Sequence, residues 1–291
     1  MLRQFRQDSS YIVAYELKQL MVVSSAIAVL VWWNPWGMTD LPRLFLLCVP
    51  LLFSGPVGYL FTAMGVFAYL RPESGFDSIT AGSLCLAGVS FGLAHSQLVH
   101  FCSHNLLRPR WLNRALGEVL SLQFFGTFLG FTVLHLEHHA FADDLVQDPH
   151  PNEGEGFYRF FIRLSRTMAS GFKKIYFKLH GQTPAGSEQW RRYSLLVPTR
   201  CFSRAILFLL LLGPEGFLFF LLPSMISNHW VFGHLNYYSH LRKPDGTVEI
   251  LNLNQTLFHK LLNLLTLGAY NHANHHQAPN ALYPPQRKVR S

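Results

Sequence analysis

The histidines are the residues of this sequence whose spacing could do chemistry. Fifteen are present, and eight of them fall into three short clusters. The first is an H-x3-H pair and the other two are H-x2-HH triplets: His100 and His104; His135, His138 and His139; His272, His275 and His276. Residues three or four apart lie on one face of a helix, so each cluster can direct two or three imidazoles toward one point. This pattern predicts metal ligands.

The number of clustered histidines exceeds what one ion can hold, which predicts at least two ions. Neutral imidazole binds iron, zinc, copper or nickel, so the ligand type alone leaves the metal open. Because these ligands carry no charge, carboxylates should lie behind them and orient the rings. Five acidic residues near the first two clusters are candidates: Glu118, Glu137, Asp143, Asp144 and Asp148.

Which histidines of the first cluster bind is decided by helical spacing. His95 and His100 are five residues apart, which places them about 140° apart around a helix, whereas His100 and His104 share a face. We therefore assign His100 and His104 as ligands and leave His95 as either a ligand or a buried hydrogen-bonding residue. The four cysteines form no C-x-x-C pair, which argues against a disulfide framework, a zinc ribbon or a built-in rubredoxin-type site.

The segments that must position these histidines are strongly apolar. Hydrophobic residues make up 49% of the chain and charged residues only 14%, against about 25% charged in soluble domains. Four apolar stretches stand out, and about 20 apolar residues cross a bilayer once: residues 20–33, 44–70, 79–94 and 205–232. The sequence predicts an all-α polytopic membrane protein with four to six transmembrane helices and a cytosolic histidine-rich cap, as a single domain over residues 1–291.

Two of the apolar stretches contain breaks that predict hairpins. Ser54-Gly55-Pro56 interrupts the second stretch and Gly213-Pro214-Glu215-Gly216 interrupts the fourth. A hairpin in the second stretch makes the number of crossings before His95 even, which keeps the N-terminus and the histidines on one side. A weaker apolar stretch at residues 119–134 is expected to lie in the interface or to re-enter the membrane.

Charge is concentrated in one segment. Ten of the 24 Lys and Arg residues lie between Arg159 and Arg204, where Glu188 is the only acid. In a membrane protein such a basic loop indicates the cytoplasmic side and contact with anionic lipid. No recognition motif accompanies the charge, so nucleic-acid binding is not expected.

The histidine clusters and the segments after them resemble the membrane fatty acid desaturase and hydroxylase superfamily, which includes the integral-membrane alkane monooxygenases. The first two clusters, followed by Asp148-Pro149-His150, look like the first two histidine boxes of that superfamily. The third region is similar to the alkane monooxygenases: Asn236-Tyr-Tyr-Ser-His240, a Pro244-Asp245-Gly246 turn, an apolar helix at residues 256–267, and the third cluster. The resemblance covers residues 100–148 and 228–285.

The resemblance implies a membrane enzyme that holds two iron ions and uses O2 to oxidise a fatty-acyl or other lipid chain. It adds His240 as a ninth ligand, and it implies no catalytic residue apart from the metal ligands. Phe101 stands where an acid usually follows the first histidine, and the second box has two spacer residues rather than three, which favours the desaturases. Desaturation is the first expectation, with hydroxylation (a monooxygenase reaction) or decarboxylation to a 1-alkene as alternatives.

The resemblance also bears on partners and location. The chain has no recognisable electron-transfer domain, so electrons are expected from a separate ferredoxin-, rubredoxin- or cytochrome-type carrier. A bacterial inner membrane is expected, with the histidine boxes facing the cytoplasm. Two other classes fit the pattern less well: a histidine-lined metal transporter would place its histidines within the apolar stretches, and a bis-haem cytochrome would use single, widely spaced histidines.

Overall fold

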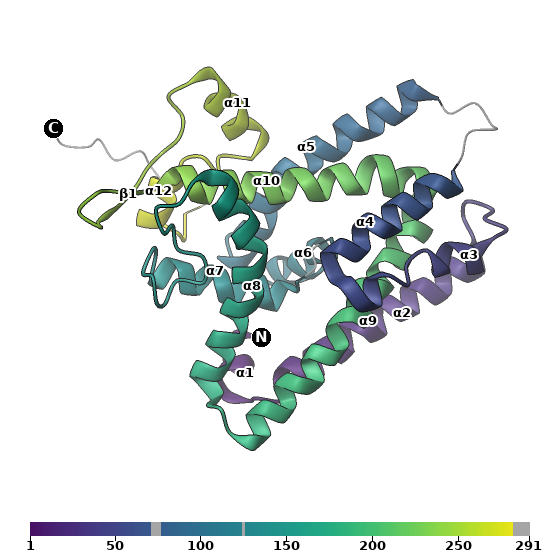
Figure 1. The fold of residues 1–291 in the computed structure, drawn as a ribbon, viewed down its shortest axis with the longest axis horizontal. Helices are drawn as coiled ribbons and strands as arrows, with labels where there is room; N and C mark the ends of the chain where they lie inside the picture. Colours follow the sequence, from purple (N-terminus) through teal and green to yellow (C-terminus); the bar gives the residue numbers. More distant parts are fainter. Residues whose placement is uncertain (71–76, 124–125, 282–291) are drawn as a thin grey trace. The chain divides into compact units, whose positions relative to one another are not determined.

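The computed structural model describes residues 1–70, 77–123 and 126–281, and its regular structure is almost entirely helical (Figure 1). The elements in chain order are α1 (Leu2–Gln7), α2 (Tyr11–Trp33), α3 (Leu41–Leu46), α4 (Leu51–Tyr69), α5 (Ser78–Ser103), α6 (Trp111–Ser121), α7 (Phe128–Ala140), α8 (Phe157–His180), α9 (Pro184–Gly216), η1 (Phe217–Leu221), α10 (Leu222–Ser239), β1 (His240–Arg242), β2 (Val248–Ile250), α11 (Leu257–Leu265) and α12 (His272–Gln277). The all-α prediction is confirmed.

The chain divides into two compact units, one of Met1–Gly88 with Tyr176–Ser224 and one of Val89–Ile175 with Met225–Ser291. The first unit holds most of the apolar helices, and the second holds all the clustered histidines. The interpretation of residues 1–291 as a single domain stays a prediction.

Among the described residues, three helical segments are long and apolar enough to cross a membrane: Tyr11–Trp33, Ser78–Ser103 and the continuous segment Pro184–Ser239. Two shorter apolar helices lie at Leu41–Phe53 and Val57–Tyr69. Large apolar side chains on these helices are exposed, as lipid contact requires; Phe53, for example, is 83% exposed. The chain is therefore a polytopic membrane protein, and the exact number of crossings stays a prediction.

The second apolar stretch folds back on itself. Residues eight apart in a straight helix are separated by about 12 Å, yet a Cβ atom at Gly58 would lie only 2.7 Å from the carbonyl oxygen of Pro50. Likewise, a Cβ atom at Gly65 would lie 2.8 Å from the side chain of Leu47. Such short distances between residues far apart in the sequence are consistent with the hairpin expected around residues 54–56.

The fourth stretch turns at Gly213. This residue has φ 69° and ψ 172°, a conformation outside the helical region that side chains rarely adopt. The indole of Trp36 packs against it, and its Nε1 atom donates a hydrogen bond to the carbonyl oxygen of Leu210 at 3.1 Å. The turn expected at residues 213–216 is therefore present.

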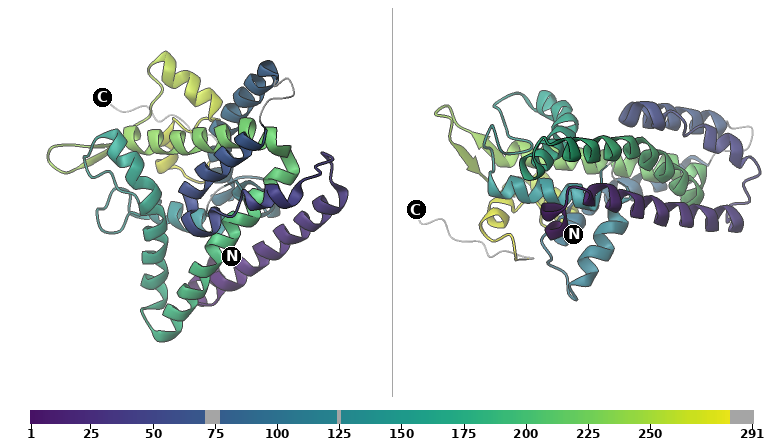
Figure 2. Two further views of the ribbon diagram at one scale, coloured as in Figure 1. Left: turned by 45° about the vertical axis from the view of Figure 1, so that its right-hand side comes forward. Right: turned by 90° about the horizontal axis from the view of Figure 1, so that it is seen from below.

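Within the first unit, α2 and α9 lie side by side (Figures 1 and 2). Between them the Nη1 atom of Arg200 donates to Oε2 of Glu16 at 2.6 Å, and both side chains are buried. Arg204 is buried as well. The basic segment forms α8 and α9 rather than a continuous loop, and Arg200 and Arg204 near its end are buried instead of solvated. That the segment faces the cytoplasm stays a prediction.

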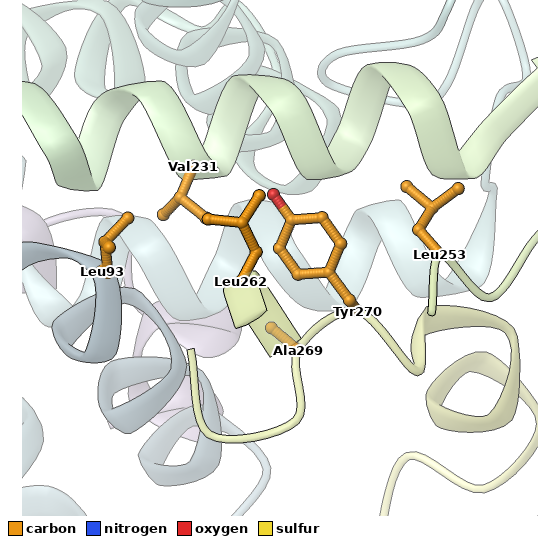
Figure 3. Close-up of a cluster of buried hydrophobic side chains, with 6 residues drawn as sticks. All are labelled: Leu93, Val231, Leu253, Leu262, Ala269 and Tyr270. Carbon is orange, nitrogen blue, oxygen red and sulfur yellow. The ribbon is translucent and has the colours of Figure 1, made fainter. Parts of the chain in front are cut away.

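The second unit contains a small apolar core (Figure 3). The core joins α5, α10, α11 and the turn before α12 through Leu93, Val231, Leu253, Leu262, Ala269 and Tyr270. The Thr256 hydroxyl accepts from the backbone N–H of His259 and caps α11, which places that helix where the sequence predicted it. The hydroxyl of Tyr270 lies 2.9 Å from Nδ1 of His234 on α10, and this contact anchors the turn that leads into α12.

Two further segments fix histidine positions. The Pro244-Asp245-Gly246 turn joins antiparallel strands β1 and β2, and His240 begins β1 opposite Ile250. The stretch at residues 119–134 divides into α6 and α7, and Thr127 caps α7 by accepting from Gly130 N–H at 3.0 Å.

Candidate metal centre

Nine histidines converge on two points in the second unit. The first group contains five residues whose ligand atoms all lie within 4.8 Å of one another: His100, His104, His135, His139 and His275. The second group meets the same limit with four residues: His138, His240, His272 and His276. These are the nine histidines singled out by sequence, so every candidate ligand lies in one of two compact sets.

The two triplets each divide between the groups. On α7, His135 and His139 are one turn apart and face the first group, whereas His138 faces the second. On α12 the division is reversed, because His272 and His276 face the second group and His275 faces the first. Neighbouring residues on a helix are about 100° apart, so adjacent histidines cannot reach one point. Each triplet therefore contributes histidines to both groups.

Within the groups the imidazole nitrogens approach at distances that suit a shared ion. In the first group, Nε2 of His104 lies 2.8 Å from Nε2 of His135, and the Nε2 atoms of His100 and His275 are also 2.8 Å apart. In the second, Nε2 of His272 lies 2.9 Å from Nε2 of His240. Two nitrogens held at right angles about 2.1 Å from one ion would be about 3 Å apart.

One atom in the second group tests the fit directly. Nε2 of His138 is buried and has no hydrogen-bond partner among the described residues. A buried polar atom without a partner costs free energy and usually indicates an unfilled role. A metal ion at this point would give that nitrogen a partner, so the residues present fit a metal site.

Comparison with known proteins shows the family of this chain. A model of the family described as fatty acid desaturase matches residues 78–290, which is well over half of the chain and includes all nine histidines. The chain belongs to the fatty acid desaturase family. No curated protein and no solved structure matches it. Membership confirms the resemblance to the desaturase and hydroxylase superfamily, and it implies a lipid substrate and a membrane environment.

Burial favours the neutral form of five imidazoles in this desaturase-family site. Burial lowers the pKa of His104 to about 4. Burial, together with neighbouring histidines, lowers the pKa of His139 to about 3 and that of His275 to about 2. The pKa values of His135 and His272 lie well below the ordinary value for the same reasons. Neutral imidazoles offer lone pairs to a metal at physiological pH.

Two of the five candidate carboxylates orient histidines of the second group. Oδ2 of Asp148 accepts from Nδ1 of His138 at 2.8 Å, and Oδ2 of Asp143 accepts from Nδ1 of His240 at 2.5 Å. Each bond fixes the tautomer that leaves Nε2 free to bind a metal. Burial raises the pKa of Asp143, but the bonds from His240 and from Asn152 N–H outweigh it, so the pKa ends below its usual value.

The other candidate carboxylates have different surroundings. Asp144 is exposed and accepts from the backbone N–H groups of Val146 and Gln147 in its own loop. Glu118 lies 3.9 Å from Arg114 on α6. Glu137 is half-buried on α7. Asp143 and Asp148 reach the histidines because the loop after α7 brings their carboxylates beside the rings of His240 and His138.

His95 belongs to neither group. Its Nε2 donates to the carbonyl oxygen of Leu120 at 2.9 Å, and its Nδ1 accepts from the side-chain amide of Asn228 at 2.9 Å. Both ring nitrogens are therefore engaged in hydrogen bonds that link α5, α6 and α10. This geometry favours the second of the two readings left open by the sequence, a buried hydrogen-bonding histidine.

Two further histidine features lie at the edges of the site, one at His100 and one at His150. Nδ1 of His100 is buried without a hydrogen-bond partner among the described residues, in keeping with Phe101 replacing the usual acid beside it. His150, which spacing did not single out, is buried with its ring centroid 4.5 Å from that of His138. Its backbone N–H donates to Oδ1 of Asp148 at 2.9 Å. The Asp-Pro-His step was the only sequence signal for it.

Proposed function

We propose that this protein is an O2-dependent di-iron membrane enzyme that introduces a double bond into a fatty-acyl or lipid chain. The observation that carries the proposal is the pair of histidine groups, five and four residues, within one compact unit of a desaturase-family chain. One ion would be held by each group. When bound, the two iron ions would activate O2, the oxidant, toward an unactivated C–H bond of the chain.

The residues of this chain prepare the site in three ways. The nine imidazoles, most of them buried, supply the nitrogens that would hold the metal ions. Asp148 and Asp143 hold the Nδ1 protons of His138 and His240, so that Nε2 of each ring points inward. Burial of the ligands limits the access of water, which would otherwise compete for the metal and quench a reactive oxidant.

The proposal includes a setting and partners. The substrate would be a fatty-acyl or other lipid chain that enters from the bilayer. Electrons would come from a separate ferredoxin-, rubredoxin- or cytochrome-type carrier on the cytoplasmic side. A bacterial inner membrane is proposed, with the histidine groups facing the cytoplasm.

Hydroxylation is the second candidate function, because the third region resembles the alkane monooxygenases. The Asn236-to-His240 motif that carries that likeness delivers His240 into the second histidine group. Both reactions begin with removal of one hydrogen atom from the chain. Removal of a second hydrogen atom then gives an alkene, whereas addition of oxygen gives an alcohol. Formation of a 1-alkene by decarboxylation is a third outcome.

Metal analysis tests the proposal. Purified wild-type protein should hold about two iron ions per chain. His138→Ala and His275→Ala each remove one ligand from a different group, so each variant should lose iron. His180→Ala, outside both groups, is the control and should retain it. Zinc, no metal, or iron retained in both group variants would contradict the proposal and favour a histidine-lined transporter.

Product analysis then distinguishes the reactions. Lipids, free alcohols and volatile alkenes from expressing cells would be compared with those from cells that express His138→Ala. New internal double bonds would support desaturation, hydroxylated chains would support the monooxygenase reaction, and terminal alkenes would support decarboxylation.

A further inference from the structure

Helix α11 exposes an apolar face in the second unit. Leu257, Leu261 and Leu264 are 84%, 54% and 74% exposed. They lie within about 60° of one another around the helix, because each residue turns about 100°. The buried side chain of this helix is Leu262, which packs into the apolar core. The three exposed leucines therefore form a leucine face that is separate from the face that the core uses.

The polar residues of α11 lie on its remaining side. Lys260 is exposed, and His259 and Asn263 are half-buried. Lys260 and Leu264 are four residues apart and so are neighbours on the helix surface, which places the lysine at the border of the leucine face. A short helix with one apolar side, one polar side and a lysine at their border is typical of a helix that lies in the surface of a bilayer.

The packing of α11 on α5 gives its depth relative to the membrane. Leu262 and Leu93 belong to one buried cluster (Figure 3). Val89 and Phe91, which precede Leu93 on this membrane-spanning helix, are exposed, as apolar side chains in contact with lipid are. His100 of the first histidine group follows Leu93 by seven residues, which is about 10 Å along the helix. The contact with α11 therefore lies between the lipid-exposed part of α5 and its histidine.

Helix α10 gives the same order. It belongs to the segment Pro184–Ser239, which is long and apolar enough to cross a membrane. Val231 packs in the cluster that contains Leu262, and the exposed Ile226 precedes it by five residues. His240 of the second histidine group follows Val231 at the start of β1. Both helices thus place α11 at the boundary between their lipid-exposed parts and the histidines, where the surface of the bilayer is expected.

We propose that α11 lies in the surface of the bilayer, with its leucine face among the lipid acyl chains and Lys260 at the level of the headgroups. The leucine face is covered by bilayer lipid because it continues the lipid-exposed surfaces of α5 and α10. Residues 266–271 join α11 directly to α12, which carries the third histidine cluster. A bilayer that holds α11 therefore also restrains the helix from which both histidine groups draw members.

Fluorescence quenching tests the position of α11 in the full chain in phosphatidylcholine nanodiscs. A bimane label would be attached at Leu261→Cys or, on the opposite side of the helix, at the control His259→Cys, which keeps the backbone N–H that Thr256 caps. Both would be made in a Cys85→Ser background, whose other cysteines are buried. Phosphatidylcholine brominated on its acyl chains should quench the label at position 261 roughly twofold or more over that at position 259. Water-soluble iodide should give the reverse order.

Two outcomes would overturn the position of α11. Equal quenching of the two labels by brominated lipid would mean that the leucine face does not contact acyl chains. Protection of position 261 from both quenchers, together with a doubled mass of the protein in the particle, would assign the leucine face to a second copy of the chain.

Hydrogen exchange in the same nanodiscs tests the restraint on α12. Leu257→Ser/Leu261→Ser/Leu264→Ser removes the leucine face, so the backbone amides of residues 257–277 should exchange severalfold faster than in wild type. Leu145→Ser/Val146→Ser removes two similarly exposed apolar side chains from the loop after α7 and is the control. Exchange that is unchanged in the triple variant, or equally faster in the control, would contradict a restraint by the bilayer.

Discussion

Nδ1 of His138 lies 2.8 Å from Oδ2 of Asp148, and neither side chain is more than 3% exposed. The same carboxylate accepts from the backbone N–H groups of Asp143 and His150. A single buried acid therefore fixes both the tautomer of one candidate ligand and the path of the loop that carries a second orienting acid. The orientation of His138, and through the loop the position of Asp143 beside His240, depend on this contact.

Removal of that carboxylate should weaken metal binding at one group only. We expect Asp148→Ala to lower the affinity for one of the two ions by about 10- to 100-fold, because His138 loses the partner that orients its ring. Retained metal would be measured during titration with a chelator. Asp144→Ala, an exposed acid in the same loop, is the control and should behave like wild type. Equal losses in both variants would indicate a general loop defect.

The sequence predicted which histidines lie together better than it predicted how they divide between the two groups. Clustered spacing brought out eight of the nine grouped histidines, and the resemblance supplied His240. Helical spacing separates adjacent histidines, but which group each member of a triplet joins depends on how α7 and α12 face each other. The hairpins were predictable because Pro and Gly interrupt apolar stretches at residues 54–56 and 213–216.

Loop geometry and burial of charge were harder to foresee. Asp143 and Asp148 could not be separated from Asp144, because the irregular loop after α7 has no periodicity that assigns side chains to one face. The burial of Arg200 was hidden because a dense run of basic residues normally indicates a solvated surface. Its partner, Glu16, lies 184 residues away in the sequence, and no local pattern connects them.

We expect His95 to stabilise the fold rather than to bind a metal ion. His95→Ala removes the donor to Leu120 and the acceptor for Asn228, and each buried group left without a partner costs about 1–3 kcal/mol. We expect a lower melting temperature with unchanged iron content. The two readouts would be taken on the same detergent-purified sample. Loss of iron from a variant that remains folded would instead assign His95 to the metal centre.

Acid should destabilise the metal-free protein in a defined range. The pKa of His104 is lowered to about 4 and that of His139 to about 3, whereas both titrate near 6.5 when unfolded. The unfolded chain therefore binds more protons below pH 6.5, and stability falls as pH decreases from 6.5 toward 4. Each such histidine contributes up to about 1.4 kcal/mol per pH unit.

Thermal unfolding of chelator-treated protein between pH 8 and pH 5 would measure this effect. The melting temperature should be nearly constant above pH 7 and should fall steadily below 6.5. Replacement of His104 and His139 by Gln should reduce the slope. An unchanged slope in that double variant would show that other groups control acid sensitivity.

The ion pair between Arg200 and Glu16 should be important to the first unit, because both charges are buried between α2 and α9. Glu16→Ala leaves a buried guanidinium without its carboxylate, and breaking a buried pair in this way typically costs about 3–5 kcal/mol. Glu188→Ala removes an acid that forms exposed pairs with Arg191 and Arg192, and such pairs contribute little to stability because water and salt screen them. Melting temperatures of the two variants in the same detergent would be compared. Similar small losses in both would mean that Arg200 finds another counter-charge or water when Glu16 is absent, and that the pair does not hold α2 against α9.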